Sequence, residues 1–162
     1  MGPRTSVTEA GVDSARMRIV PAEKAHIKEW LEMRVALWPE CLRSDSQKEI
    51  EETLSSERTT AFIAFHGDRA VGFAEVSTRD YVEGCTTGPV GYLEGIYVHP
   101  DFRMGGIARA LVRTAESWSR SRGCKEFGSD ACVDDNASIA FHNSVGFRET
   151  DRQIVFLKAI GD

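Results

Sequence analysis

Between Leu93 and Leu111 the sequence runs from a short apolar strand through a Gly-rich turn into the start of an amphipathic helix. The turn has the form Arg-x-x-Gly-x-Ala, from Arg103 to Ala108. Glycine lets the backbone approach a ligand closely, and the first turn of a helix presents unpaired N–H groups with a partial positive charge. This pattern predicts a phosphate-binding turn. An ordinary Gly-rich turn of an α/β protein is the alternative interpretation.

The composition excludes several classes of protein. A chain of 162 residues with 41% hydrophobic and 28% charged residues is typical of one globular domain with a real core. The net charge of −5 argues against a general nucleic-acid binder. No apolar run reaches the roughly 20 residues of a membrane span, and no signal-peptide core is present near the start. We therefore expect a cytoplasmic protein with no nucleic-acid or membrane partner.

The cysteines and histidines do not have the spacing of metal ligands. None of the four cysteines forms a Cys-x-x-Cys pair, and no histidine stands beside them at ligand spacing. We expect reduced thiols, as in other cytosolic proteins, and no bound metal.

The hydrophobic pattern predicts a disordered extension over residues 1–16 and a single α/β domain over residues 17–162. Helices are expected at 23–38, from a capping box at Ser46–Glu49 onward, at 107–122 and at 136–144. Strands are expected at 17–20, 60–65, 70–77, 90–98 and 125–131, with one or two closing strands between 147 and 159. The order is β-α-α-β-β-β-α-β-α-β(-β), a mixed and mostly antiparallel sheet flanked by helices.

This strand, turn and helix resemble the acyl-CoA pyrophosphate loop of the GNAT N-acetyltransferase superfamily, whose element order is the one expected here. The resemblance implies that acetyl-CoA binds with its pyrophosphate on the turn and its pantetheine arm paired to the central strand like an extra strand. The cofactor-binding residues that it implies are Ile96, Tyr97, Val98, Arg103, Met104, Gly105, Gly106, Ile107, Ala108 and Arg109.

A second segment, from Asn136 to Phe147, is similar to the superfamily's Asn-…-Phe-Tyr-x-x-x-Gly-Phe segment, which packs on the pantetheine. This similarity adds Asn136 and His142 to the cofactor-binding residues. His142 stands where many members carry the Tyr that protonates the leaving thiolate, which makes it a candidate catalytic acid. A packing role for His142 and a plain N-cap role for Asn136 remain open.

The chain also resembles one branch of the superfamily, the aminoglycoside 6'-N-acetyltransferases, over residues 17–158. This resemblance implies acetyl transfer from acetyl-CoA to the 6'-amino group of aminoglycosides, antibiotic resistance as its result, and a homodimer. The segments that carry it are Leu37–Pro39, Val71–Glu75, Asp80–Cys85, Pro89–Val98 and Gly123–Asp130.

A pocket for a polycationic aminoglycoside needs carboxylates and flat aromatic walls. The resemblance matches four positions to drug contacts: Trp38, Tyr81, Glu94 and Asp130. A primary amine is neutral in only about one molecule in a thousand at pH 7, so a base is required. We expect Glu94 to be that base, through water, and Asp130 to hold substrate ammonium groups. Ordinary ion-pair carboxylates and ordinary core or surface aromatics are the alternatives.

The expected mechanism is direct attack of the neutral amine in a ternary complex, with the oxyanion on a backbone N–H near Ile96 or Tyr97. A covalent route through Cys132 is a less favoured alternative. Two other functions stay open at this point. One is acetylation of a polyamine, a metabolite amine or a protein amine, and the other is a non-catalytic acyl-CoA-binding module.

Overall fold

The computed structural model describes residues 17–161, so the extension expected at residues 1–16 lies outside the described residues. Five strands form one sheet in the order β1-β2-β3-β4-β5. The strands are β1 (Met17–Pro21), β2 (Thr59–His66), β3 (Arg69–Arg79), β4 (Val90–Val98) and β5 (Phe127–Ser129). The first four are antiparallel neighbours, and β5 runs parallel to β4. The expected mixed, mostly antiparallel sheet is confirmed.

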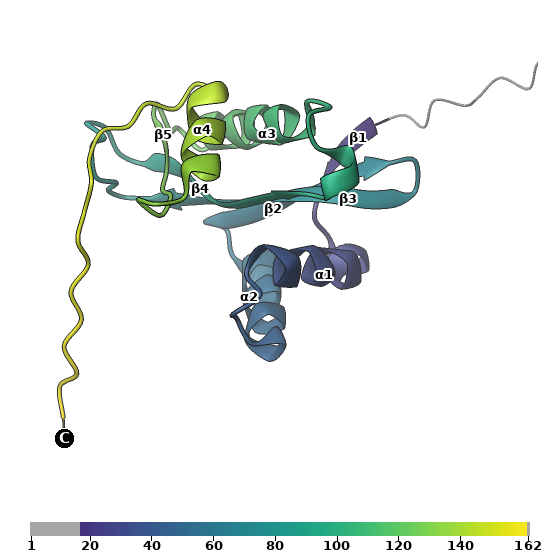
Figure 1. Cartoon of the computed structure of the whole chain (residues 1–162), viewed down its shortest axis with the longest axis horizontal. Coiled ribbons are helices and arrows are strands. Elements are labelled where there is room, and N and C mark those ends of the chain that lie inside the picture. Colours follow the sequence, from purple (N-terminus) through teal and green to yellow (C-terminus); the bar gives the residue numbers. More distant parts are fainter. Residues whose placement is uncertain (1–16, 162) are drawn as a thin grey trace, which may run out of the picture.

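Helices cover both faces of the sheet (Figure 1). The 3-10 turn η1 (Lys24–His26) leads into α1 (Ile27–Leu37), which lies with α2 (Arg43–Ser55) on one face. The short η2 (Pro100–Phe102) follows β4, and α3 (Ile107–Ser121) and α4 (Asn136–Ser144) lie on the other face. A right-handed crossover through α3 is the usual way to join the parallel pair β4 and β5.

Alternation along β3 explains why both faces are covered. Phe73 is fully buried among Trp30 and Ile50 of α1 and α2, whereas Ala74 packs with Leu111 and Val112 of α3. Because successive side chains of a strand point to opposite faces, β3 contributes to both cores. The two cores therefore hold α1 and α3 against the same central strands.

Two local predictions need correction. The helix predicted from a capping box at Ser46 begins three residues earlier, at Arg43, and Ser46 is buried within it. Arg34 of α1 donates to the Ser46 carbonyl, so contact between the two helices outweighed the local capping signal. The strand predicted at 125–131 is shorter, because β5 pairs with β4 only from Phe127 to Ser129.

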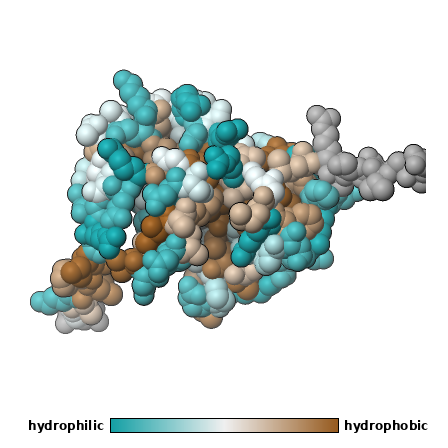
Figure 2. Space-filling view, turned by 45° about the horizontal axis from the view of Figure 1, so that its top comes forward, coloured by the Kyte–Doolittle hydropathy of each residue, from teal (hydrophilic) through white to brown (hydrophobic). Residues whose placement is uncertain are grey.

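The closing strands predicted between 147 and 159 are wrong. Residues 148–161, here called the C-terminal arm, contain no strand and extend away from the body of the molecule (Figure 1). The arm's large apolar side chains are 81–98% exposed, and Figure 2 shows them as a brown projection. Although its composition is typical of a strand, the arm pairs with no strand among residues 17–161.

No helix within residues 17–161 is long and apolar enough to cross a membrane.

Candidate functional site

The site is centred on an irregularity in β4. Glu75 of β3 lies opposite Gly95 and Val76 lies opposite Leu93, so Glu94 is the extra residue of a β-bulge. β5 pairs with β4 only over Gly91–Leu93, so the rest of β4 has no neighbouring strand on that side within residues 17–161. The backbone of Ile96–Val98 is thus placed to pair with an extended ligand.

The predicted phosphate turn is present at the start of α3. Gly106 is the N-cap residue in a left-handed conformation, with φ of 82°, and provides no side-chain cap. The exposed Met104 is also left-handed, with φ of 64°. Because no N-cap side chain occupies the first N–H groups of α3, they are available to an anion. The turn therefore fits the pyrophosphate of acetyl-CoA.

The two arginines of the turn also make contacts within the protein. Arg103 Nε donates to the carbonyl of Val98 at 2.9 Å and ties the turn to the end of β4. Arg109 Nη2 donates to the carbonyl of Ser144 at 2.9 Å and ties α3 to α4. The contact of Arg109 therefore orients α4, which carries His142.

His142 belongs to α4, and its side chain reaches the end of β5. Its Nδ1 is 2.7 Å from the Ser138 carbonyl, which can only accept, so Nδ1 carries a proton. Its Nε2 is 2.9 Å from Ser129 Oγ, which is also 3.1 Å from the Leu93 carbonyl. The Ser129 hydroxyl donates to the Leu93 carbonyl, directly before the bulge residue Glu94. The ring therefore reaches the bulge through one hydroxyl group.

Asn136 begins α4 but does not cap it. The N-cap residue is Asp135, whose carboxylate accepts from the Ser138 N–H at 2.9 Å. The alternative of a plain N-cap role for Asn136 is therefore wrong, and its exposed side chain at the start of α4 stays a candidate contact for acetyl-CoA.

Glu94 accepts hydrogen bonds from two residues of β3. Arg79 donates through Nε at 3.2 Å to Oε1 and through Nη2 at 2.7 Å to Oε2. The Ser77 hydroxyl donates to Oε1. A charge-assisted pair with two N–H donors has a well-defined geometry, so the structure places Glu94 in an ion pair. This ion pair leaves the carboxylate one-third exposed.

Tyr92 links Glu94 to Asp130. The Arg79 guanidinium lies 3.5 Å from the centre of the Tyr92 ring. Burial, followed by the negative charge of Asp130, raises the pKa of Tyr92 to about 12. Asp130 itself is exposed directly after β5. Both predicted carboxylates therefore act on the same tyrosine.

Trp38 lies directly over the bulge. A Cβ atom on Gly95 would lie 2.4 Å from the Trp38 ring, so glycine is needed for this approach. The ring also contacts Phe73 and the Arg34 guanidinium. Arg34 in turn pairs with the buried Glu75 at 2.8 Å. Trp38 is therefore held beside Glu94 by a buried ion pair.

Of the four predicted acceptor contacts, Tyr81 is the one that the structure does not bring to the bulge. Its side chain is 66% exposed, and its hydroxyl donates to Glu83 of the same loop at 2.7 Å.

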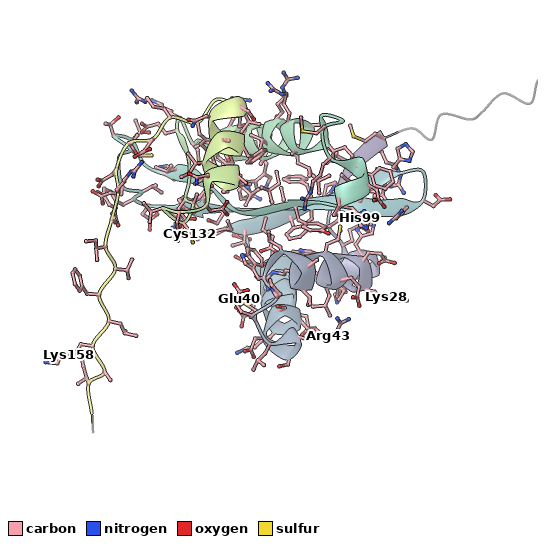
Figure 3. All side chains as sticks on the ribbon, in the orientation of Figure 1. Lys28, Glu40, Arg43, His99, Cys132 and Lys158 are labelled. Atoms are coloured by element: carbon pink, nitrogen blue, oxygen red, sulfur yellow. The ribbon has the colours of Figure 1, made fainter. Side chains whose placement is uncertain are left out.

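Cys132, the candidate for a covalent route, is a free and exposed thiol in the loop between β5 and α4 (Figure 3). Among the described residues, no group of three or more His, Cys, Asp or Glu side chains is arranged to hold a metal ion.

Sequence reasoning missed Ser77, Arg79, Tyr92 and Ser129. A signal for the first three exists, because Ser77 and Arg79 alternate on β3 as Tyr92 and Glu94 do on β4. Residues two apart on antiparallel neighbours share a face of the sheet. Ser129 gives no such signal, because its contact with His142 depends on the packing of α4.

Comparison with known proteins agrees with this geometry. Residues 27–147 match the model of the Acetyltransferase (GNAT) family. The aminoglycoside N(6')-acetyltransferase type 1 of Acinetobacter haemolyticus is 42% identical over 145 residues, which cover 89% of this chain and 99% of that protein. The enzyme of the same name from Salmonella typhimurium is 37% identical and covers 88% of this chain and 99% of its own.

Solved structures show the same likeness. The apo 6'-N-acetyltransferase AAC(6')-IG of A. haemolyticus superposes with a TM-score of 0.86 at 40% identity, covering 89% of this chain and 99% of its own. AAC(6')-Iy in complex with the bisubstrate analogue CoA-S-monomethyl-acetylneamine gives 0.87 at 36% identity, with coverages of 90% and 99%. Sequence and structure together place the chain in the GNAT acetyltransferase family, within the branch of the aminoglycoside N(6')-acetyltransferases.

Proposed function

We propose that this protein transfers the acetyl group of acetyl-CoA to the 6'-amino group of aminoglycoside antibiotics and thereby gives resistance to them. The observation that carries the proposal is the position of the Glu94 carboxylate. It lies at the β4 bulge, with Trp38 over the adjacent Gly95 and, within residues 17–161, no strand paired to Ile96–Val98 on the β5 side. A carboxylate beside an acyl-CoA groove is what an amine acceptor requires.

On the acetyl-CoA side, the backbone N–H groups of residues 103–108 and the start of α3 hold the pyrophosphate. Ile96, Tyr97 and Val98 pair with the pantetheine arm, and Asn136 and His142 contact it from α4. Arg103 contributes positive charge through the guanidinium nitrogens that do not bind Val98.

On the acceptor side, Asp130 and Glu94 bind ammonium groups, and Trp38 walls the pocket; the exposed Tyr81 is not part of that wall. Glu94 takes a proton from the 6'-ammonium, directly or through one water. The neutral amine then attacks the thioester carbonyl and forms a tetrahedral intermediate, whose oxyanion a backbone N–H near Ile96 or Tyr97 stabilises. The amine nitrogen loses its second proton to solvent, the C–S bond breaks to leave the amide, and His142 donates a proton to the leaving thiolate.

The test is a thiol-release assay with acetyl-CoA and a panel of amines. The panel contains kanamycin, an aminoglycoside with a 6'-hydroxyl, spermidine and a lysine peptide. We expect turnover of kanamycin and none of the 6'-hydroxyl drug. Turnover of spermidine or the peptide alone would mean that the protein is an acetyltransferase whose acceptor is not an aminoglycoside. Binding of acetyl-CoA without any turnover would favour the binding-module alternative.

We also propose that the protein is a homodimer in which a second copy covers the C-terminal arm. Exposed apolar residues are rarely concentrated in one short segment, as Ile154, Val155, Phe156 and Leu157 are here. Thr150 packs against Gly84, so the arm leaves the body at the loop after β3. Figure 3 shows Lys158 near the far end of the arm, away from the body of the protein. An arm that reaches outward in each copy suits a two-fold symmetric exchange.

Light scattering tests this proposal on the full chain and on a chain ending at Gln153. The full chain should have twice the mass of one copy, and the shortened chain the mass of one. A full chain that stays monomeric across the concentration range would overturn it.

We further propose that residues 17–162 act as one domain in the cytoplasm. Limited proteolysis and cell fractionation test these two points.

A further inference from the structure

Arg79 is fixed on two sides at the end of β3. Its Nε and Nη2 donate to the two oxygens of Glu94, and the face of its guanidinium lies on the Tyr92 ring at 3.5 Å. Ser77, two residues earlier on the same strand, donates to the same carboxylate. The Glu94 side chain is therefore held by three donors that belong to one strand.

We propose that Arg79 is a positioning residue that holds Glu94 ready for the acceptor amine. This inference rests on the proposed function and adds a residue to it. Oε1 of Glu94 accepts from both Ser77 and Arg79, whereas Oε2 accepts only from Arg79. A carboxylate oxygen has two lone-pair positions. Oε2 therefore keeps one position for the proton of the substrate ammonium or of a bridging water.

The neighbouring pair Arg58–Asp80 shows what an ordinary surface ion pair looks like in this protein. Both of its side chains are more exposed, at 55% and 85%, against 43% and 33% for Arg79 and Glu94. An exposed pair of this kind contributes little to stability. The Arg79–Glu94 pair adds a ring beneath the cation and a third donor to the anion, which is the support expected of a preorganised group.

The charge of Arg79 has a second consequence. A guanidinium stays protonated throughout the working pH range, and its charge disfavours a second cation beside it. Glu94 pairs directly with Arg79, and Asp130 acts on the neighbouring Tyr92. Arg79 therefore opposes the protonated form of the incoming amine, while the two carboxylates attract the remaining ammonium groups. Removing the guanidinium charge should move the acidic limb of the pH–rate profile to higher pH.

The experiment compares Arg79→Gln, Arg79→Lys and the matched control Arg58→Gln with the unchanged protein, using acetyl-CoA and kanamycin. We expect Arg79→Gln to lower kcat by about 10- to 100-fold, as misplaced catalytic groups do, with an unchanged KM for acetyl-CoA. Arg79→Lys should restore the position of the acidic limb but not kcat, because lysine cannot donate to both oxygens in a fork. Arg58→Gln should match the unchanged protein.

Two results would overturn the inference. One is a kcat of Arg79→Gln equal to that of Arg58→Gln. The other is a lower KM for kanamycin at unchanged kcat, which would mean that Arg79 only occupies the place of the substrate cation. If the unchanged protein acetylates no amine, the proposed function fails separately. A crystal structure of Arg79→Gln then decides, because a displaced Glu94 carboxylate supports the inference and an unmoved one contradicts it.

Discussion

The proposed acetyl-CoA side and the proposed acceptor side of this site are built from different parts of the chain. The first comes mostly from one continuous stretch, the end of β4 and the turn into α3, and uses backbone N–H and C=O groups. The second uses side chains from four separate segments: Trp38 after α1, Arg79 on β3, Glu94 on β4 and Asp130 after β5. Both meet at the β4 bulge.

This difference predicts which kinds of amino-acid substitution each side tolerates. A backbone site depends on the conformation of the turn, so substitutions act on it through φ and ψ. A side-chain site depends on charge and position, so a single isosteric change can remove its chemistry. Substitutions on the two sides should therefore affect different kinetic constants, which the following predictions test.

The largest effect is expected for Glu94→Gln, which keeps the shape of the base and removes its charge. We expect kcat to fall by about 10²- to 10⁴-fold, the usual contribution of a general base. The Kd for acetyl-CoA, measured by calorimetry, should not change. Glu52→Gln on the exposed face of α2 is the control. Equal turnover of Glu94→Gln and the control would contradict the role of Glu94.

Trp38→Ala should act on the acceptor side alone. The ring lies over the bulge, and loss of an aromatic wall for a cation costs about 1 kcal/mol or somewhat more. We therefore expect the KM for kanamycin to rise roughly fivefold to tenfold, with the KM for acetyl-CoA unchanged. Trp38→Phe should recover most of the loss. A rise in both KM values would show that the two sides are not independent.

Gly106→Ala should act on the acetyl-CoA side through the backbone. Gly106 has φ of 82° and open space around its Cβ position, so the cost is the left-handed conformation, about 1 kcal/mol. We expect the Kd for acetyl-CoA to rise about fivefold. Gly123→Ala has nearly the same φ, 83°, at the other end of α3 and should leave this Kd unchanged. Equal Kd values for the two variants would argue against binding at the turn.

The smallest effect concerns the loop that carries Tyr81. Donation from Thr87, and then from Thr86, lowers the pKa of Glu126 below its ordinary value of 4.5. Because the folded-state pKa is depressed, this contact stabilises the fold above pH 4.5 and is lost as the pH falls through the folded value. In thermal unfolding, the difference between the unchanged protein and Glu126→Gln should be small at pH 7 and should vanish under acid. A constant difference would show that the loop does not depend on the charge of Glu126.

The sequence predicts best where the structure is local. The bounds of β4 at Val90–Val98 and of α4 at Asn136–Ser144 were predicted correctly, and Gly123 ends α3 in the left-handed conformation. The bounds of α4 and the end of α3 depend on residues within a few positions of one another, and the bounds of β4 follow its own apolar run. The turn at Arg103–Ala108 belongs to the same class, because a strand end, two glycines and a helix start suffice to form it.

The errors lie where a distant contact decides the outcome. The capping signal at Ser46 was outweighed by Arg34 on the neighbouring helix. The strand composition of the C-terminal arm has no partner strand within residues 17–161. The ion pair between Arg79 and Glu94 joins residues 15 positions apart. It depends on the register of β3 and β4.

Hydrophobic periodicity and turn residues predicted the order of the elements from β1 to α4 and the Gly-rich turn before α3, because both are properties of short segments. The acceptor-pocket residues came from the resemblance to a family. The tertiary structure was needed to show that Arg79 and Ser77 hold Glu94 and that His142 reaches the bulge through Ser129. These contacts depend on strand register and helix packing, which no short segment specifies alone.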